Sequence, residues 1–528
     1  MARQSEEMVQ ENKKDIQEKN PSAGNDELRY IWILILLIVV AYCAYIPMHY
    51  GNDTWFALKN YQSMDAMQEG YVQAVMGEAV YSCFSAGRYT RGLLFLAFAL
   101  PGYASLLVKP WVNVVAIVFL CLSGITLWKI VRSCCDEESC GSVCRSILFL
   151  CCCIAVVNPF FTDWLQFTEI NLYHPLGLYL SLAAGKVILD SSKSGWKRFM
   201  ESCILLAAAG GLYQIVMFYY AAVVVMLLGR NVKSGCFRLK RFFREAFCSG
   251  MVYVFAAGVQ LLFTRILFQS ERITSYSAGE IWESMLQAQK NLYRMTPYTG
   301  NRLSVLYTVL LIALLLQGIL RIACCKDHVL VRFVLYVLRF AAVYVLLFVP
   351  FVVSLWFSQR TLVGFWMLPL VAAVMNQEAE MRWAVSCEKY VLWAAEAAGA
   401  VLLLVNVWSS LQFGVDMYKV YGMDTARART MLEKIEEYEE ESGQIVTEVA
   451  FYQPENKKYY YDGIFGYCEN NQVRWTASWN QLPILEVVGN RNFTQVEYPE
   501  ELLAEQSSGQ QEKDSIFFEG NTAYIILY

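Results

Sequence analysis

The chain has 528 residues, of which 56% are hydrophobic and 17% are charged, and its formal net charge is −4. So little polar surface cannot cover a soluble globule of this length, which predicts a polytopic α-helical membrane protein whose main surroundings are the lipid bilayer. The slightly acidic balance argues against a nucleic-acid partner, because nucleic acids bind to basic surfaces.

Apolar segments predict about eleven transmembrane helices after a polar tail. Residues 1–29 lack apolar periodicity and also lack the basic start and cleavage site of a secretory signal, which predicts a cytoplasmic tail. Several of the predicted spans are shorter than the roughly 20 residues that a full crossing needs. The spans are Tyr30–Met48, Trp111–Val131, Ser146–Phe161, Leu176–Leu189, Cys203–Tyr213, Ile215–Leu228, Phe247–Leu267, Leu303–Leu320, Val331–Val353, Leu362–Met375 and Val391–Trp408.

Basic residues in the short loops set the orientation. With the N-terminus inside, the loops after the second, fourth, sixth and eighth spans fall on the cytoplasmic side, and all four are rich in Lys and Arg. An odd number of spans then places everything after Trp408 outside. The basic residues are Arg132 and Arg145, then Lys193, Lys197 and Arg198, then Arg230, Lys233, Arg238, Lys240, Arg241 and Arg244, and finally Arg321, Lys326 and Arg332.

Two segments test this count. Gly92–Leu107 is apolar enough to span, but a span here would move the basic loops outside, so we predict a re-entrant or interfacial helix. Cys203–Leu228 could form one long helix. We divide it at Tyr213 and Gln214, because a Gly-Gly pair and a polar Gln interrupt the apolar run.

The composition changes after the last span, which predicts a membrane domain over residues 30–408 and a small extracytoplasmic α+β domain over residues 409–528. Asp424–Glu441 is charged and helix-forming. Four short segments rich in β-branched and aromatic residues predict strands, namely Thr447–Tyr452, Ile484–Val488, Ser515–Phe518 and Ala523–Tyr528.

The chain has seventeen cysteines, a number that suggests a disulfide or metal framework, but their positions in the sequence argue against one. Most fall in apolar runs or in basic, cytoplasmic loops, where disulfides rarely form. Cys134, Cys135, Cys140 and Cys144 match no standard zinc spacing. We therefore expect no metal and no cofactor, and we interpret His174 as an interfacial residue.

Carboxylates gather in the outer loops. Asp53 follows the first span and could act as a general base toward a hydroxyl, although a helix cap is the simpler role. Asp163 and Glu169 lie in an aromatic loop, where acidic residues at a bilayer edge are costly enough to mark a site; a solvated loop charge is the alternative for Glu169. Trp164 would suit stacking on a sugar, or it belongs to the interfacial aromatic belt.

Arginines complete the outer surface. Arg88 follows Gly87 before the re-entrant segment, and Arg360 lies at the outer end of a late hydrophobic hairpin. Guanidinium groups bind phosphate through two hydrogen bonds and keep their charge at any relevant pH. Such a site suits a substrate with a lipid tail, a phosphate and a polar head. For Arg91 we favour an anchor whose stem snorkels along the membrane.

These motifs resemble the bacterial O-antigen glucosyltransferases of the serotype-converting Gtr type II family. The resemblance runs from about Tyr30 to Trp408 and rests on the order of Asp53, Gly87-Arg88, the Asn158-Pro159 loop and Leu212-Tyr213-Gln214. That family resembles the GT-C architecture, whose members take a sugar from a polyprenyl phosphate at the outer leaflet.

The resemblance implies a role for each matched residue. Asp53 would be the catalytic base and Glu169 a second catalytic carboxylate that orients hydroxyls. Substrate binding would fall to Arg88, Arg360, Asp163, Trp164 and Gln214. It further implies a polyprenyl-phosphate donor, a surface-glycan acceptor and a multi-pass location in the bacterial cytoplasmic membrane. The family name alone implies that the transferred sugar is glucose. Asn52 and Tyr89 depart from the family pattern, which would affect the choice of acceptor.

Two other functions share this topology. A transporter or flippase of lipid-linked glycans would carry ionisable residues at mid-membrane and often inverted repeats, whereas here the candidates lie outside and no internal repeat is seen. A glycan polymerase would join oligosaccharides instead of adding one sugar, and the sequence barely separates it from a transferase.

Overall fold

The computed structural model describes residues 21–135, 141–233, 237–268, 277–292, 301–325, 327–348, 359–379, 386–453, 475, 477–499 and 515–527. Residues 1–20 of the predicted tail, Cys140 and the end of the predicted span Val331–Val353 lie outside these ranges. The described part is mostly helical, with one small sheet near the C-terminus.

Seven helical segments in the described residues are long and apolar enough to cross a membrane. The remaining predicted spans correspond to α7 (Ser142–Val156), α9 (Tyr173–Ile188), α10 (Gly195–Leu212) and α16 (Leu368–Met375), which are shorter or more polar. The seven segments belong to α2 (Pro21–Tyr42), α6 (Trp111–Cys134), α11 (Met217–Leu228), α12 (Leu239–Leu261), α14 (Asn301–Ala323), α15 (Val329–Leu346) and α17 (Ser386–Ser442).

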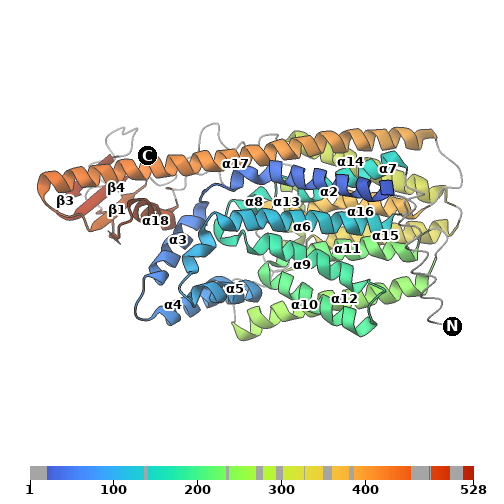
Figure 1. The fold of residues 1–528 in the computed structure, drawn as a ribbon, viewed down its shortest axis with the longest axis horizontal. Helices are drawn as coiled ribbons and strands as arrows, with labels where there is room; N and C mark the ends of the chain where they lie inside the picture. Colours follow the sequence, from blue (N-terminus) through green and yellow to red (C-terminus); the bar gives the residue numbers. More distant parts are fainter. Residues whose placement is uncertain are drawn as a thin grey trace.

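The helices run roughly parallel in one elongated bundle, and the sheet lies beyond one end of it (Figure 1). The basic loops meet at the other end. Arg230 donates a hydrogen bond to Ser133, and Arg332 donates one to the carbonyl of Val232. A cavity lined by Arg198 and Arg244 joins the α9–α10 turn to the start of α12. All four basic loops therefore share one end, as the sequence predicts.

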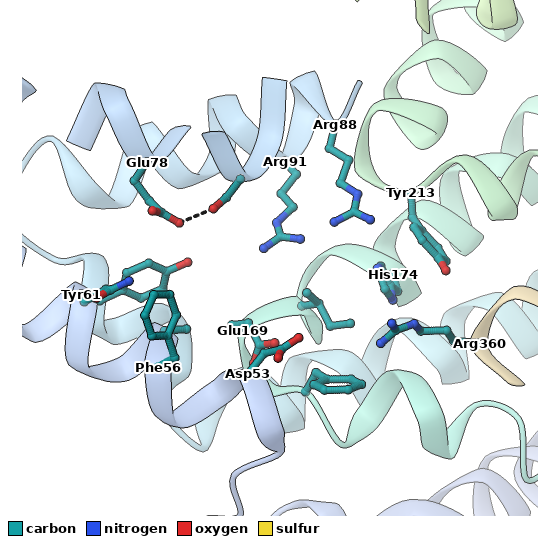
Figure 2. Close-up of a pocket in the computed structure, with 15 residues that line it drawn as sticks. Asp53, Phe56, Tyr61, Glu78, Arg88, Arg91, Glu169, His174, Tyr213 and Arg360 are labelled. Carbon is teal, nitrogen blue, oxygen red and sulfur yellow. Dashed lines mark hydrogen bonds between the residues drawn. The ribbon is translucent and has the colours of Figure 1, made fainter. Parts of the chain in front are cut away.

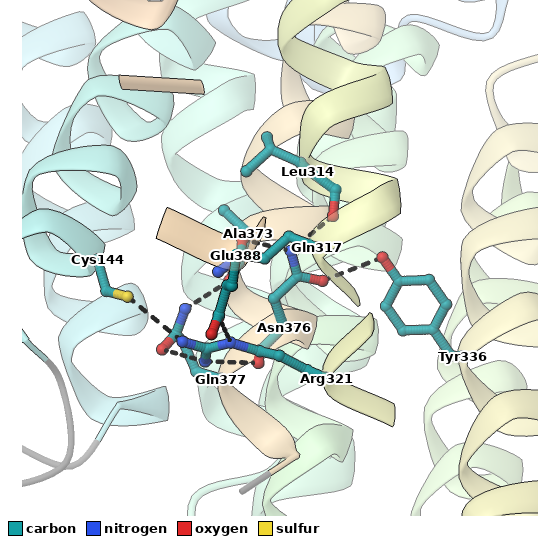
Figure 3. A network of polar contacts seen from close by, with 9 residues as sticks. All are labelled: Cys144, Leu314, Gln317, Arg321, Tyr336, Ala373, Asn376, Gln377 and Glu388. Atoms are coloured by element: carbon teal, nitrogen blue, oxygen red, sulfur yellow. Dashed lines mark hydrogen bonds and ion pairs between the residues drawn. The ribbon is translucent and has the colours of Figure 1, made fainter. Parts of the chain in front are cut away.

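A buried polar network locks the helices together at this basic end (Figure 3). Arg321 on α14 donates to Glu388 on α17 at 2.7 Å and to the carbonyl of Asn376 at 3.0 Å. The side chain of Asn376 accepts a hydrogen bond from Tyr336 on α15 at 3.1 Å. Arg321 also reaches Cys144 on α7 at 3.5 Å. The network joins α7, α14, α15 and α17, and it pairs the charge of Arg321 with that of Glu388.

Both ambiguous segments have defined structures. The first contains α5 (Tyr89–Ala99), a turn and the helical turn η4 (Ala104–Val108), so neither piece is long enough to span. In the second, α10 ends at Leu212, Tyr213 is extended, and the helical turn η6 (Gln214–Val216) leads into α11. The predicted break at Tyr213 and Gln214 is confirmed.

α3 (Asn52–Asp65) lies at the sheet end of the bundle (Figure 1), where it packs against η4. Before α5 come α4 (Tyr71–Glu78) and the helical turns η2 (Ala79–Cys83) and η3 (Phe84–Ala86); α8 (Thr162–Leu165) and η5 (Thr168–Ile170) follow α7. The remaining described turns are η1 (Cys43–Tyr45), η7 (Gly229–Asn231), η8 (Leu262–Leu267), η10 (Gln359–Thr361), η11 (Val363–Met367) and η12 (Asn376–Glu378), and α13 spans Ala278–Leu292.

The last predicted span and the charged helix after it form a single helix. α17 continues for 57 residues from the basic end to the sheet, so the predicted domain boundary at 408 lies inside it. The sheet has the order β2-β1-β4-β3, with strands β1 (Glu448–Tyr452), β2 (Thr494–Gln495), β3 (Ser515–Glu519) and β4 (Thr522–Ile526). β4 is parallel to β1 and antiparallel to β3.

One predicted strand is wrong. Ile484–Val488 lies within α18 (Ser478–Gly489), which packs against α3 and α17. A short apolar run has the same composition in a buried helix and in a buried strand. Here Ile484 and Leu485 are both buried in a hydrophobic core that also contains residues of α3 and α17. The tertiary environment decides the conformation.

Candidate active site

A cavity of about 230 Å³ opens at the sheet end of the bundle. Four predicted site residues line it, although they come from distant parts of the chain: Asp53 from α3, Arg88 from the turn before α5, Glu169 from η5 and Arg360 from η10 (Figure 2). The fold thus brings together the acidic and basic residues that the sequence indicated separately.

Two carboxylates lie near each other at one wall of the cavity. Asp53 is exposed in the first turn of α3, whereas Glu169 is only 7% exposed and accepts a hydrogen bond from Thr54 at 2.6 Å. Burial, followed by the charge of Asp53, raises the pKa of Glu169 to about 7. Near neutral pH the protonated and ionised forms of Glu169 are therefore both populated.

Close packing fixes the start of α3 against the aromatic loop. A Cβ atom at Gly51 would lie 2.8 Å from the carbonyl oxygen of Gln166, so only glycine allows this approach. His49 contacts the carbonyl of Leu165 at 3.0 Å, and Thr168 donates to the carbonyl of His49 at 3.2 Å. These contacts determine how close Asp53 comes to Glu169.

Arg88 is held by a left-handed turn at Gly87, whose φ is +71°. Gln214 stabilises this turn by donating to the carbonyl of Ala86 at 2.7 Å, which accounts for the helix break beside it. The guanidinium lies 5.8 Å from the ring centroid of Tyr213, and its buried Nε has no hydrogen-bond partner among the described residues. Burial and then the charge of Arg91 lower its pKa to about 10, so Arg88 stays positive at neutral pH.

Arg360 is held through its backbone. Its N–H donates to Asp163 at 2.9 Å, and its carbonyl accepts from the indole N–H of Trp164 at 3.0 Å. Asp163 and Trp164 are themselves buried and do not line the cavity. The side chain of Arg360 lies over the ring of Phe167, 5.1 Å from its centroid.

Several cavity residues were not predicted as site residues. The anchor interpretation of Arg91 is wrong, because this side chain is buried in the cavity with its guanidinium 5.2 Å from the ring centroid of Tyr173. His174 is also buried there and stacks on Tyr213, with centroids 3.8 Å apart. Burial and the charges of the nearby arginines lower the pKa of His174 well below its ordinary value, so its ring is neutral. Glu78 of α4 is the remaining unpredicted carboxylate.

The cavity separates two kinds of chemistry (Figure 2). Arg88 and Arg360 lie near Tyr213 on one side, where they suit an anionic group. Asp53 and Glu169 lie next to each other on the side away from Tyr213 (Figure 2), where they suit proton transfer and hydrogen bonding to hydroxyls. Within the described ranges, no group of His, Cys, Asp or Glu residues is arranged to hold a metal ion.

Comparison with known protein families supports the resemblance seen in the sequence. The model of the family described as Glucosyl transferase GtrII matches residues 72–376, which is more than half of the chain. Neither the curated proteins nor the solved structures gave a match. The matched range includes Arg88, Glu169 and Arg360, whereas Asp53 and the C-terminal sheet lie outside it. The predicted family is confirmed, and the chain belongs to the GtrII glucosyl transferases.

Proposed function

We propose that the protein transfers glucose from a polyprenyl-phosphate donor to a cell-surface glycan at the outer face of the bacterial cytoplasmic membrane. Membership of a glucosyl transferase family and the seven apolar helices among the described residues support a membrane enzyme of this class. The proposal includes an N-terminus inside and a GT-C-like arrangement of about eleven membrane segments, with residues 409–528 outside. The clustering of the basic loops at the end opposite the cavity supports this orientation.

The observation that carries the proposal is the guanidinium of Arg88, whose Nε has no hydrogen-bond partner in the part of the chain that the structure describes. A partly buried guanidinium with an unpartnered Nε is costly unless a ligand supplies an anion. Arg91 and Arg360 line the same cavity, so a group with more than one negative charge would be stabilised there. The phosphodiester of a polyprenyl-phosphate sugar carries one negative charge, and the leaving polyprenyl phosphate gains a second as the glycosidic bond breaks.

A direct displacement fits these residues. The acceptor hydroxyl gives its proton to Asp53 while its oxygen forms a bond to the anomeric carbon. The bond from that carbon to the phosphate oxygen breaks, and polyprenyl phosphate leaves with the electron pair toward Arg88 and Arg360. Glu169 orients a hydroxyl beside Asp53. Asp163, Trp164 and Gln214 act on the substrate by holding Arg360 and Arg88 in position.

A route for the lipid tail lies beside Arg88. Tyr81 on η2 and Ile266 on η8 are both 68% exposed. Phe84 of η3, which follows η2 directly, stacks its ring on that of Phe263 in η8, with centroids 6.4 Å apart. This apolar surface would let a polyprenyl chain remain in the bilayer while its phosphate enters the cavity.

The proposal is tested by incubating the purified protein with labelled polyprenyl-phosphate glucose and a crude envelope glycan fraction. A parallel reaction receives labelled UDP-glucose. We expect label to move to the glycan only from the lipid donor. Transfer from UDP-glucose alone would overturn the lipid donor. Movement of intact labelled lipid across proteoliposomes without cleavage would instead identify a flippase, and joining of preformed oligosaccharides would identify a polymerase.

A further inference from the structure

One face of α3 lines the cavity. Asp53, Phe56 and Asn60 are spaced three and four residues apart, which places them in a row on one side of a helix, and all three contribute to the cavity wall. Ala57 and Tyr61 belong to the same face. The row therefore starts at the proposed base and continues for about two turns away from it.

The side chains along this row are available to a ligand. Phe56 is 44% exposed although it is a large apolar residue beside a polar cavity. The side-chain amide of Asn60 has no hydrogen-bond partner among the described residues, and it is only partly exposed. An amide offers two donors and an acceptor, so this position can bind hydroxyl groups.

The opposite wall contributes a carboxylate to the same end. Glu78 at the end of α4 lines the cavity and accepts a hydrogen bond from Ser82. Figure 2 shows Glu78 and Phe56 at the end of the cavity away from Arg88 and Arg360. This end thus combines an aromatic face, an amide and a carboxylate, and Arg91 lies between Glu78 and Arg88 in Figure 2.

We propose that Phe56, Asn60 and Glu78 form the subsite for a hexose unit of the acceptor glycan. One face of the sugar ring packs its C–H groups on Phe56, while hydroxyls bind to Asn60 and Glu78. A neighbouring hydroxyl is then delivered to Asp53, which lies one helical turn from Phe56. This inference rests on the proposed function and adds to it the residues that select the acceptor.

The competing occupant of this end is the sugar of the donor. If the acceptor binds here, these residues affect the KM for the acceptor; if the donor sugar binds here, they affect the KM for the donor. If the acceptor binds here, removing the ring of Phe56 or the amide of Asn60 raises the KM for the acceptor and leaves the KM for the lipid donor unchanged.

The test measures both constants in Phe56→Ala and Asn60→Ala. We expect the acceptor KM to rise about tenfold in each, with the donor KM within about twofold of the wild type. Phe56→Tyr should restore the acceptor KM because it keeps the aromatic face. Gln62→Ala is the matched control, since Gln62 is an exposed amide on α3 that does not line the cavity. Size-exclusion profiles and melting temperatures verify that each variant is folded.

The possible failures are distinguishable. A raised donor KM with an unchanged acceptor KM would assign this end to the donor sugar and overturn the inference. Unchanged constants in both variants would also overturn it. The absence of any transfer by the wild type would overturn the proposed function, and the inference with it.

Discussion

Lys59 on α3 and Glu486 on α18 form an ion pair with a separation of 3.0 Å, and this pair joins the helix that carries Asp53 to the C-terminal region. Glu486 is buried and also accepts a hydrogen bond from the backbone N–H of Phe493 at 2.7 Å. Nearby, Trp55 stacks on Tyr421 of α17, with centroids 5.6 Å apart. One face of α3 thus lines the cavity while another packs on the C-terminal elements.

This arrangement predicts that the C-terminal region positions α3. Lys59→Met leaves Glu486 buried without its cation, so we expect a lower melting temperature and about a tenfold fall in kcat as Asp53 shifts. Transfer assays and thermal unfolding of the purified protein measure both effects. Lys59→Arg should retain most activity. Lys434→Met removes an exposed lysine of α17 and serves as the control; an equal loss in this variant would contradict the prediction.

Arg88 is expected to act mainly in the transition state. In the proposed mechanism the charge of Arg88 faces the leaving phosphate, so Arg88→Met should lower kcat by about 10²–10³. Arg88→Lys keeps the charge but cannot form the bidentate hydrogen bonds of a guanidinium to phosphate, so it should recover part of the rate. Arg244→Met, at the basic end, provides the control. A change confined to the acceptor KM would argue against a role at the phosphate.

Gly87 is expected to tolerate no side chain. Its φ of +71° is unfavourable for alanine, and the added Cβ would lie 2.7 Å from Thr264 Cγ2. Gly70 has the same φ of +71° with nothing within 4 Å of its Cβ position. Both Gly87→Ala and Gly70→Ala should therefore lose about 1 kcal/mol of stability from the backbone, and Gly87→Ala should lose more because of the contact with Thr264. Only Gly87→Ala should lose most transfer activity. Equal activity in the two variants would show that the turn does not position Arg88.

The raised pKa of Glu169 predicts a dependence of stability on pH. The pKa is about 7 in the folded protein and near 4.5 when the chain is unfolded, so the folded state binds the proton more tightly. Stability is therefore lost as pH rises from about 4.5 to about 7. Glu169→Gln has no such loss, and its melting temperature should exceed that of the wild type by more at pH 8 than at pH 5. The free energy of unfolding that the wild type loses through Glu169 over this pH range is at most about 3 kcal/mol. A difference that does not vary with pH would contradict this prediction.

Much of the helical arrangement is predictable from the sequence, because apolar runs indicate the membrane spans and basic loops indicate which ends of the helices lie on the same side. The break at Tyr213 could be predicted because glycines and a polar side chain interrupt an apolar run. The continuity of α17 could not be predicted. A change from apolar to charged composition marks a change of surroundings and not the end of a helix. The helical state of Ile484–Val488 depends on contacts with α3 and α17 that are distant in sequence.

The residues of the candidate site were also predictable only in part. Asp53, Arg88, Glu169 and Arg360 could be identified because charged residues at the ends of apolar segments are uncommon, and they share one cavity. Their catalytic and binding roles stay predictions. Arg91 and His174 were misjudged because the sequence does not show which side of α5 and α9 faces the cavity. The one available signal was proximity, since Arg91 follows Arg88 by one helical turn and His174 follows Glu169 by five residues.

The most direct test of the central claim compares Asp53→Asn with the wild type in two assays on the same preparation. One measures binding of labelled polyprenyl-phosphate glucose, and the other measures label transferred to the glycan in a single turnover. If Asp53 is the base, the variant should bind the donor like the wild type, because the arginines are intact, and should transfer at least about 10³-fold more slowly. Transfer at the wild-type rate with normal donor binding would contradict the account.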